Sequence, residues 1–255
     1  MQFNKDLAHA LSPSAWAKEY FGLDLDPWQI QMLDSPSRRV ILNIHRQGGK
    51  STMSSLAVLH TALFRPNSLS LIIAPALRQS QENFKKVRWF IDQLPSCPSF
   101  DESTKLSLQF DNGSRILSLP GGSEGATIRG FSRPDVIVED EASRCSDELY
   151  QALRPMMATN PHCKLILCST PWGQRGHFYK IWAKESDWLK LRVVASECKR
   201  ITQSFLNEEK KALGPWVFSQ EYEGEFVGDE SQLFTLAMVK RAHDTTIPIV
   251  SLGGF

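Results

Sequence analysis

The residue types at positions 44–52, with the sequence IHRQGGKST, could bind the phosphates of a nucleotide. Gly48 and Gly49 would let backbone N–H groups approach a phosphate closely. Lys50 could reach the β and γ phosphates, and Ser51 could ligate Mg²⁺ at a helix N-terminus, where the helix dipole favours anions. This is the second half of the P-loop pattern G-x-x-x-x-G-K-[ST], with an apolar run before it and an amphipathic stretch after it.

The first half of the P-loop pattern is not matched, because Ile44 stands where a glycine is expected. Gln47 and Thr52 complete the nucleotide-binding residues predicted for this loop. Arg46, inside the loop, supplies positive charge that could stabilise a transferring phosphoryl group. The alternative interpretation is a glycine turn that happens to precede Lys-Ser.

A second apolar run, residues 135–141 with the sequence DVIVEDE, ends in acidic side chains. Open α/β sheets place ligands at the C-terminal ends of their strands, where a P-loop protein needs such acids. Asp140 would hold Mg²⁺ through its water shell, and Glu141 would polarise the water that attacks the γ phosphate. Glu139 interrupts the apolar run early, which leaves a one-residue shift of these roles open. A solvated acidic loop after a core strand is the alternative.

Two further segments could act on the phosphates. Arg129, in the sequence ATIRG ahead of the acidic strand, is a second candidate for stabilising the phosphoryl group, within one subunit or across a subunit boundary. A surface ion pair is the alternative for this arginine. Ser169, Thr170 and Pro171 end another apolar run. Their hydroxyls could hydrogen-bond the γ phosphate or the acids and couple hydrolysis to a moving part, although Ser-Thr-Pro is also an ordinary turn.

Two segments could contact a nucleobase or a nucleic acid. Gln29, after Pro27 and Trp28, could bind the adenine edge because its amide both donates and accepts hydrogen bonds. A core tryptophan beside a surface glutamine is the alternative. Residues 84–89, with the sequence FKKVRW, could meet a DNA backbone, but an amphipathic helix with a solvated face is favoured. The six histidines show no metal-ligand spacing.

The composition limits the classes of protein. The chain has 255 residues, 42% of them hydrophobic, which is enough for one large domain or two small ones. Its net charge of +1 means that any DNA contact must be local. Five cysteines without a C-x-x-C pair argue against a disulfide framework and a structural zinc site. No signal peptide and no stretch of about 20 apolar residues is present, so no membrane contact is expected.

The elements that position these residues alternate between apolar runs and helical stretches. Strands are expected at residues 39–45, 69–74, 136–138 and 165–168, and helices near residues 51–64, 79–94, 146–157 and 176–184. Because the apolar runs are nearly continuous, both faces of each strand should be buried. The pattern predicts an α/β fold with a mainly parallel, doubly wound sheet flanked by helices.

The remaining segments carry weaker patterns. Residues 106–119 enclose Asp-Asn-Gly-Ser and predict a hairpin, interpreted as an insertion at the sheet edge. The first 36 residues should form short helices, with starts near Ser14 and Asp26. Helices are also expected at residues 202–214 and 215–223. After residue 228 the chain is interpreted as a linker or tail, with a frayed terminus as the alternative.

Taken together, these motifs resemble the ATPase domain of the large terminase subunit of tailed bacteriophages, the motor that pumps DNA into a procapsid. The resemblance covers most of the chain. It rests on HRQGGKST at residues 45–52, IIAP at 72–75, IRG at 128–130, the acidic strand at 136–141, CSTP at 168–171 with Gly173 and Gly176, and QEYEGEF at 220–226.

The resemblance implies a RecA-like (ASCE) P-loop NTPase fold over residues 1–228. A small helical lid would occupy residues 195–228, and residues 229–255 would lead toward a nuclease domain that is absent here. Large terminases normally carry that second domain, so DNA cutting is not expected of this chain. A motor-only or split form is favoured, and a truncated product is the alternative. The absent first glycine of the P-loop is itself usual in this family.

The resemblance also implies roles for particular residues. Arg129 matches an arginine finger given in trans within a ring of subunits. Arg46 matches the P-loop arginine of the family, Gln29 its adenine-recognising glutamine, and residues 169–171 its coupling motif. ATP and Mg²⁺ would be the cofactors.

The partners that the resemblance implies are double-stranded DNA, further copies of the chain in a ring at the portal vertex, the portal protein and the small terminase subunit. The protein would act in the cytoplasm of the bacterial host. Two alternatives remain. A superfamily 2 helicase shares several of these motifs but needs a second RecA-like domain. A non-hydrolysing docking module of a packaging complex would not need Lys50, Asp140 and Glu141.

Overall fold

A computed structural model describes residues 2–96, 98–121, 128 and 130–228. This part of the chain is built on a sheet with the strand order β3-β4-β5-β2-β6-β7-β1-β8. The pairs β3–β4 and β4–β5 are antiparallel, and all the other neighbours are parallel. The strands are β1 (Arg39–Ile44), β2 (Leu69–Ala74), β3 (Phe100–Ser103), β4 (Ser107–Phe110), β5 (Arg115–Pro120), β6 (Val136–Asp140), β7 (Lys164–Ser169) and β8 (Leu189–Val193).

The central strands are buried on both faces. Every residue of β2 and β6 is buried. Successive side chains of a strand point to opposite faces of the sheet. Accordingly Val136 and Val138 of β6 enter one hydrophobic core, while Ile137 enters the other. Two cores on two faces are what the continuous apolar runs of the sequence predict.

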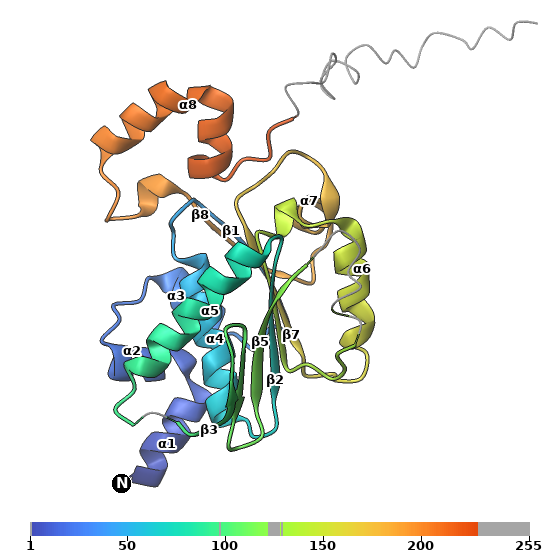
Figure 1. Ribbon diagram of the computed structural model, residues 1–255. Coiled ribbons are helices and arrows are strands. Elements are labelled where there is room, and N and C mark those ends of the chain that lie inside the picture. Colours follow the sequence, from blue (N-terminus) through green and yellow to red (C-terminus); the bar gives the residue numbers. More distant parts are fainter. Residues whose placement is uncertain (1, 97, 122–127, 129, 229–255) are drawn as a thin grey trace, which may run out of the picture.

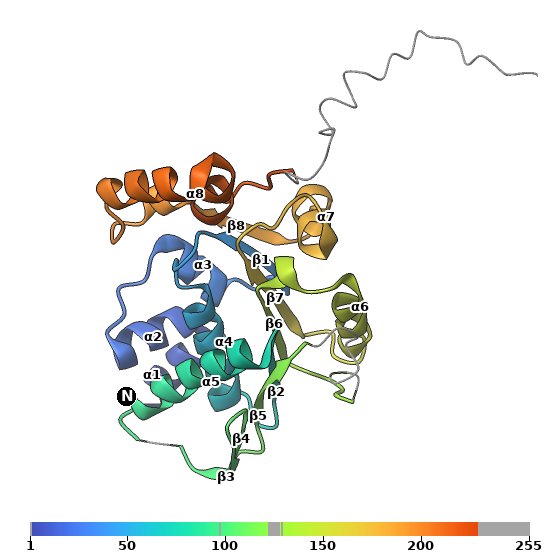
Figure 2. The same ribbon diagram turned by 45° about the horizontal axis from the view of Figure 1, so that its top comes forward.

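Helices cover the two faces of the sheet (Figures 1 and 2). The helices on one face are α1 (Gln2–Leu11), α2 (Pro13–Phe21), α3 (Pro27–Asp34), α4 (Lys50–Phe64) and α5 (Leu77–Asp92), and those on the other are α6 (Asp147–Met156) and α7 (Gly176–Lys184). The predicted α/β fold, a mainly parallel sheet flanked by helices, is confirmed.

The N-terminal helices begin at capped positions. The Oγ of Ser12 accepts a hydrogen bond from the N–H of Ala15 at 3.2 Å, and Pro13 takes the first helical position of α2. A hydroxyl followed by proline is a favourable helix start. The predicted start at Ser14 is therefore wrong by two residues. The predicted start of α3 at Asp26 is confirmed.

The predicted hairpin is present as β4 and β5, which pair antiparallel around a turn with Gly113 at φ 79°. Its interpretation as an edge insertion is wrong for β5. On its other side β5 pairs in parallel with β2 along six residues, so it belongs to the main sheet. Among the strands of the described residues, only β3 and β4 extend the sheet beyond its parallel part.

A helical unit follows β8 and lies beside the ends of β1 and β8 (Figure 1). It contains η3 (Ala195–Glu197) and α8 (Gln203–Glu223). α8 is kinked at Gly214, at φ 74°, immediately before Pro215. The kink lies where the two predicted helices were expected to meet. The unit has a small core of its own, formed by Ala195, Leu206, Phe218 and Tyr222.

The packing of α2 gives a test of the fold. Trp16 is 2% exposed and its ring contacts those of Phe21, His60 and Phe64. Trp16→Ala should lower the free energy of unfolding by about 3–5 kcal/mol, because the substitution leaves a cavity in the core. The control is Trp89→Ala, at a residue 53% exposed, which should change the free energy by about 0.5 kcal/mol or less. Denaturant unfolding measures both, and equal losses would contradict the packing.

Candidate active site

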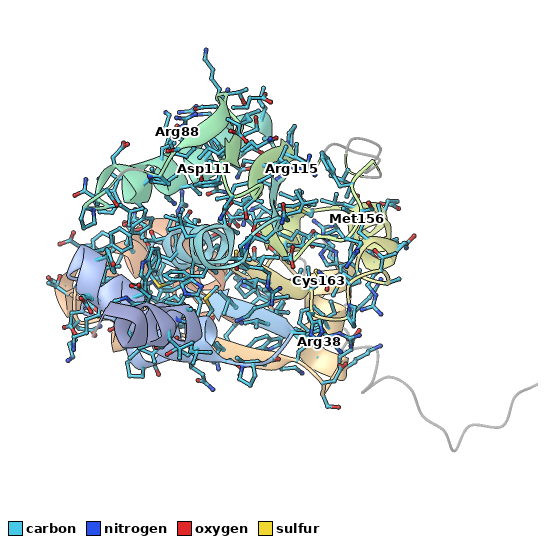
Figure 3. The ribbon with its side chains drawn as sticks, turned by 90° about the horizontal axis from the view of Figure 1, so that it is seen from below. Arg38, Arg88, Asp111, Arg115, Met156 and Cys163 are labelled. Atoms are coloured by element: carbon cyan, nitrogen blue, oxygen red, sulfur yellow. The ribbon has the colours of Figure 1, made fainter. Side chains whose placement is uncertain are left out.

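The parallel strands bring the candidate residues to one edge of the sheet. β7 lies between β6 and β1, and the register aligns Asn43 with Ser169 and Asp140 with Cys168. The residues that follow each strand are therefore neighbours in space. Figure 3 views the opposite end of the sheet, where Arg38 directly precedes β1.

The loop between β1 and α4 has a backbone that requires glycine. Gly49 precedes α4 at φ 95°, a conformation that other residues rarely adopt. A Cβ at Gly48 would lie 2.5 Å from Cγ2 of Ile44 and 3.1 Å from the carbonyl oxygen of His45. The chain thus turns sharply into the N-terminus of α4, where free N–H groups and the helix dipole favour an anion.

Lys50, the first residue of α4, is only 7% exposed. Its Nζ donates hydrogen bonds to the carbonyl oxygens of Ile44 at 2.8 Å and of His45 at 3.2 Å. Burial lowers the pKa of Lys50, while the carboxylates of Glu141 and Asp140 act in the opposite direction. The ammonium is therefore held inside the loop by neutral acceptors and faces two acids across the site.

The Asp140 carboxylate is held by donors from three elements. Its Oδ2 accepts hydrogen bonds from Oγ of Ser51 at 3.2 Å and from Nδ2 of Asn83 at 2.8 Å, and its Oδ1 accepts from Sγ of Cys168 at 3.2 Å. A hydroxyl and a carboxylate oxygen side by side suit Mg²⁺, which binds few protein ligands and keeps several waters. Within the described ranges, no group of three or more His, Cys, Asp or Glu side chains could hold a metal on its own.

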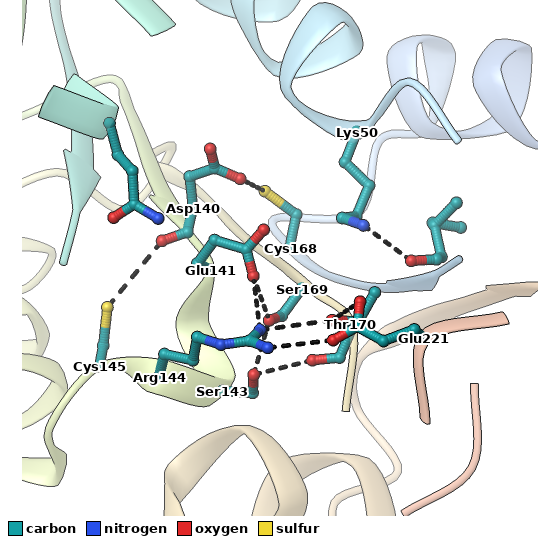
Figure 4. Close-up of polar contacts among 12 residues, drawn as sticks. Lys50, Asp140, Glu141, Ser143, Arg144, Cys145, Cys168, Ser169, Thr170 and Glu221 are labelled. Atoms are coloured by element: carbon teal, nitrogen blue, oxygen red, sulfur yellow. Dashed lines mark hydrogen bonds and ion pairs between the residues drawn. The ribbon is translucent and has the colours of Figure 1, made fainter. Parts of the chain in front are cut away.

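Glu141 follows β6 in a left-handed conformation, at φ 53°. Its Oε2 accepts hydrogen bonds from Oγ of Ser169 and from Nη1 of Arg144, both at 3.2 Å (Figure 4). Glu139 lies on the opposite face of the sheet, fully buried beside His177. The side chains of Asp140 and Glu141 thus contact residues at the loop edge of the sheet, whereas Glu139 points away from it. The roles of Asp140 and Glu141 stay predictions.

The residues after β7 connect this edge of the sheet to α8. Oγ of Ser143 lies 2.7 Å from Oγ of Ser169 and donates to the carbonyl oxygen of Thr170 at 2.7 Å. Oγ1 of Thr170 donates to Oε2 of Glu221 on α8 at 3.5 Å. Pro171, the next residue in the chain, is buried. The predicted coupling residues therefore lie between the acids and α8.

The other predicted site residues lie around the loop. Gln29 is buried, and its Oε1 accepts a hydrogen bond from the N–H of Asp26 at 2.8 Å, which caps α3. Its Nε2 lies 3.5 Å from the position of a Cβ at Gly49. The N–H of Arg46 donates to the carbonyl oxygen of Glu221 at 2.8 Å. Arg129 lies outside the described residues.

Two hollows flank the loop. One, of about 420 Å³, lies between α3, the loop and β8; its lining includes Asp26, Pro27, Trp28, His45, Gly48 and Arg200. The other, of about 350 Å³, lies between the loop and α8; its lining includes Arg46, Gln47, Phe205, Leu213, Val217 and Glu221. A nucleotide bound at the loop could extend into either.

The sequence did not identify three residues of this site. Asn83 on α5 contacts Asp140, and Arg144 and Glu221 join Glu141 to α8. Asn83 lies inside an amphipathic helix, and its position on the buried face is its only sequence signal. Glu221 lies within the motif at residues 220–226, which indicated a family but no contact.

Comparison with known proteins identifies the family. A family profile described as "Terminase large subunit, T4likevirus-type, N-terminal" matches residues 41–241. The terminase large subunit of Escherichia phage T5 is 24% identical over 214 residues, which cover 80% of this chain and 48% of that protein. The terminase large subunit of Thermus virus P23-45 is 28% identical over 180 residues, covering 64% of this chain and 37% of that protein.

Solved structures show the same fold. The large terminase ATPase domain of Thermus phage P74-26 superposes with a TM-score of 0.71 at 22% identity and covers 85% of this chain and 100% of that one. The large terminase of bacteriophage D6E in complex with ADP gives a TM-score of 0.65 at 10% identity, covering 80% of this chain and 54% of that one.

The fold is thus the RecA-like α/β fold of large terminase ATPase domains, as predicted. The chain belongs to the terminase large subunit family. Its fold is that of a large terminase ATPase domain. The chain spans about half the length, or less, of the curated relatives it matches.

In the described part of the chain, no helix combines the length and apolarity needed to cross a membrane.

A buried ion pair joins β6 to α7 on the face of the sheet that points away from the loop. Nε2 of His177, at the start of α7, is 3.1 Å from Oε1 of Glu139, in an alignment that is not that of a hydrogen bond. Burial acts to lower the pKa of His177, but the carboxylates of Glu139 and Asp147 outweigh burial and raise the pKa above its usual 6.5. The ring also stacks on Tyr150, with centroids 4.7 Å apart.

This pair predicts a pH-dependent stability. A histidine whose pKa is raised on folding stabilises the fold fully below its unfolded pKa of 6.5, and this stabilisation is lost as the pH rises through the folded pKa. His177→Gln should therefore cost most at acidic pH, about 3 kcal/mol for breaking a buried pair, and progressively less at alkaline pH. Denaturant unfolding at a series of pH values tests this, and a cost independent of pH would refute it.

Proposed function

We propose that this chain hydrolyses ATP to drive double-stranded viral DNA into a procapsid. The observation that carries the proposal is the meeting of Lys50, Asp140 and Glu141 at one edge of the sheet, in a chain of the terminase large subunit family. These groups supply what phosphoryl transfer to water needs: a cation at the phosphates, a metal-holding acid and a second acid for the water.

Nucleotide binding would use the loop and the start of α4. The phosphates would take the place of the carbonyl oxygens of Ile44 and His45 on Nζ of Lys50. Gly48, Gly49 and the N-terminus of α4 would supply N–H donors, with Gln47 and Thr52 beside them. The D6E large terminase has been solved with ADP and with ATP-gamma-S, which supports a nucleotide as the ligand.

The metal ion and the adenine base of the nucleotide would bind on either side of the phosphates. Ser51 and Asp140, whose oxygens lie 3.2 Å apart, would hold Mg²⁺, and the metal would neutralise charge on the phosphates. The adenine would enter the hollow lined by Trp28 and Arg200. Oε1 of Gln29 accepts the N–H of Asp26 in the cap of α3, and its Nε2, on the side of Gly49, would donate to the adenine edge.

Hydrolysis would be directed by Glu141, which would orient the attacking water and accept its proton. Arg46 of the same subunit and Arg129 of a neighbour would stabilise the charge of the transferring phosphoryl group. Residues 169–171 would pass the change at the γ phosphate to α8, because Ser169 contacts Glu141 and Thr170 contacts Glu221.

The wider assembly is part of the same proposal. Residues 1–228 would form the ATPase domain, with a lid at residues 195–228, and residues 229–255 would be a linker or tail. The partners would be double-stranded DNA, other copies in a ring, the portal protein and the small terminase subunit. The site of action would be the portal vertex of a procapsid in the bacterial cytoplasm.

Glu141→Gln tests the catalytic assignment. Loss of the general base should lower Mg²⁺-dependent phosphate release by about 10²–10⁴-fold, while ATP affinity should stay within a few-fold. The matched control is Glu148→Gln, at an exposed position on α6, which should keep wild-type activity. Unchanged phosphate release by Glu141→Gln would show that another group activates the water.

The trans role of Arg129 predicts cooperation between copies. The total rate of ATP hydrolysis should rise more steeply than linearly with protein concentration, because each site is completed by a neighbour. Arg129→Ala and Glu141→Gln should each be nearly inactive alone, and a mixture should recover part of the activity. In the mixture a Glu141→Gln subunit supplies Arg129 to the site of an Arg129→Ala neighbour, whose own Glu141 is intact. If no mixing ratio restores phosphate release, the assignment in trans is wrong.

A further inference from the structure

Arg144 joins the candidate catalytic acid to the residues that follow β7. It ends η2 (Ala142–Arg144), and its Nη1 donates to Oε2 of Glu141 at 3.2 Å. The same Nη1 lies 3.4 Å from Oγ1 of Thr170 (Figure 4). A single guanidinium nitrogen therefore contacts both the acid proposed to orient water and a hydroxyl proposed to couple hydrolysis to movement.

The other nitrogen of the guanidinium reaches α8. Nη2 donates to Oε1 of Glu221 at 3.1 Å, and the guanidinium carbon lies 4.6 Å from the centroid of the Trp172 ring. The Glu221 side chain is only 10% exposed, and its backbone carbonyl binds the N–H of Arg46. The ion pair between Arg144 and Glu221 thus joins η2, which follows the acidic strand, to α8. It lies where α8 meets the phosphate-binding loop.

We propose that Arg144 is a positioning residue that makes the orientation of Glu141 depend on the place of α8. This inference rests on the proposed function and names a regulation of the same site. With α8 as seen here, one guanidinium is shared between the carboxylates of Glu141 and Glu221. A movement of α8 that withdraws Glu221 removes one of these partners, and the guanidinium and the Glu141 carboxylate then settle into a different arrangement.

Arginine suits this role for a physical reason. Its guanidinium is a rigid, planar fork, so a change at one nitrogen reorients the other. Trp172 covers the face of the fork and holds its plane. The bonds to Glu141 from Arg144 and Ser169 both fall on Oε2, so the contact sets the angle at which the carboxylate faces a water. The catalytic rate depends on that angle, whereas ATP binding through Lys50 does not.

A double-mutant cycle tests the inference. The chain carrying Arg144→Gln, Glu221→Gln or both is compared with wild type for kcat and KM in steady-state ATP hydrolysis, at one protein concentration and with DNA present. Each single substitution should lower kcat about tenfold and change KM less than about threefold. The double variant should lose about as much as Arg144→Gln alone, because without Arg144 the Glu221 carboxylate no longer acts on Glu141.

The matched control is Gln220→Ala. Oε1 of Gln220 accepts a hydrogen bond from the N–H of Gly173 at 3.1 Å, so this substitution also removes a tie between α8 and the segment after β7, without touching Arg144 or Glu141. It should keep kcat within about twofold of wild type. A comparable loss of kcat in Gln220→Ala would show that Arg144 serves only to attach α8 and would overturn the inference.

The remaining outcomes are distinct. If wild type is active and depends on Glu141 but the losses from Arg144→Gln and Glu221→Gln multiply, or appear mainly in KM, the inference is wrong and the proposed function stands. If wild type releases no phosphate, or Glu141→Gln is as active as wild type, the proposed function fails and this inference fails with it.

Discussion

The buried ammonium of Lys50 is the constraint on which the rest of the site depends. A charge so far removed from water is costly unless hydrogen bonds and opposite charges compensate it. The carbonyl oxygens of Ile44 and His45 supply the hydrogen bonds, and Asp140 and Glu141 supply the opposite charge. The tight turn of the loop and the acids at the end of β6 are therefore parts of one electrostatic arrangement, which a bound phosphate would complete.

The parallel sheet makes this arrangement possible, because it delivers the ends of β1, β6 and β7 to the same edge. Each strand end also carries a contact to a neighbouring element. Asp140 is held by α5 through Asn83, and Thr170 reaches α8 through Glu221. Movement of α5 or α8 would thus change the hydrogen bonds of Asp140 or Thr170 at this edge of the sheet.

Much of this arrangement could be predicted from the sequence, because the loop and the acidic strand are runs of consecutive residues with strong local patterns. β8 was not predicted, since an edge strand exposes part of both faces and its sequence LKLRV has no continuous apolar run. Asn83 and Arg144 were missed for a different reason. Their partners Asp140 and Glu221 lie 57 and 77 residues away in the chain, and only the fold brings them together.

We propose that Lys50 exchanges its carbonyl partners for the phosphates of a nucleotide. Calorimetric titration of ATP with Mg²⁺ into wild type and into Lys50→Ala tests it most directly. We expect a single site in wild type and an affinity at least about tenfold lower in Lys50→Ala, because the substitution removes a charged hydrogen-bonding partner of the phosphates. Equal affinities, in two proteins of equal unfolding free energy, would show that Lys50 does not bind the phosphates.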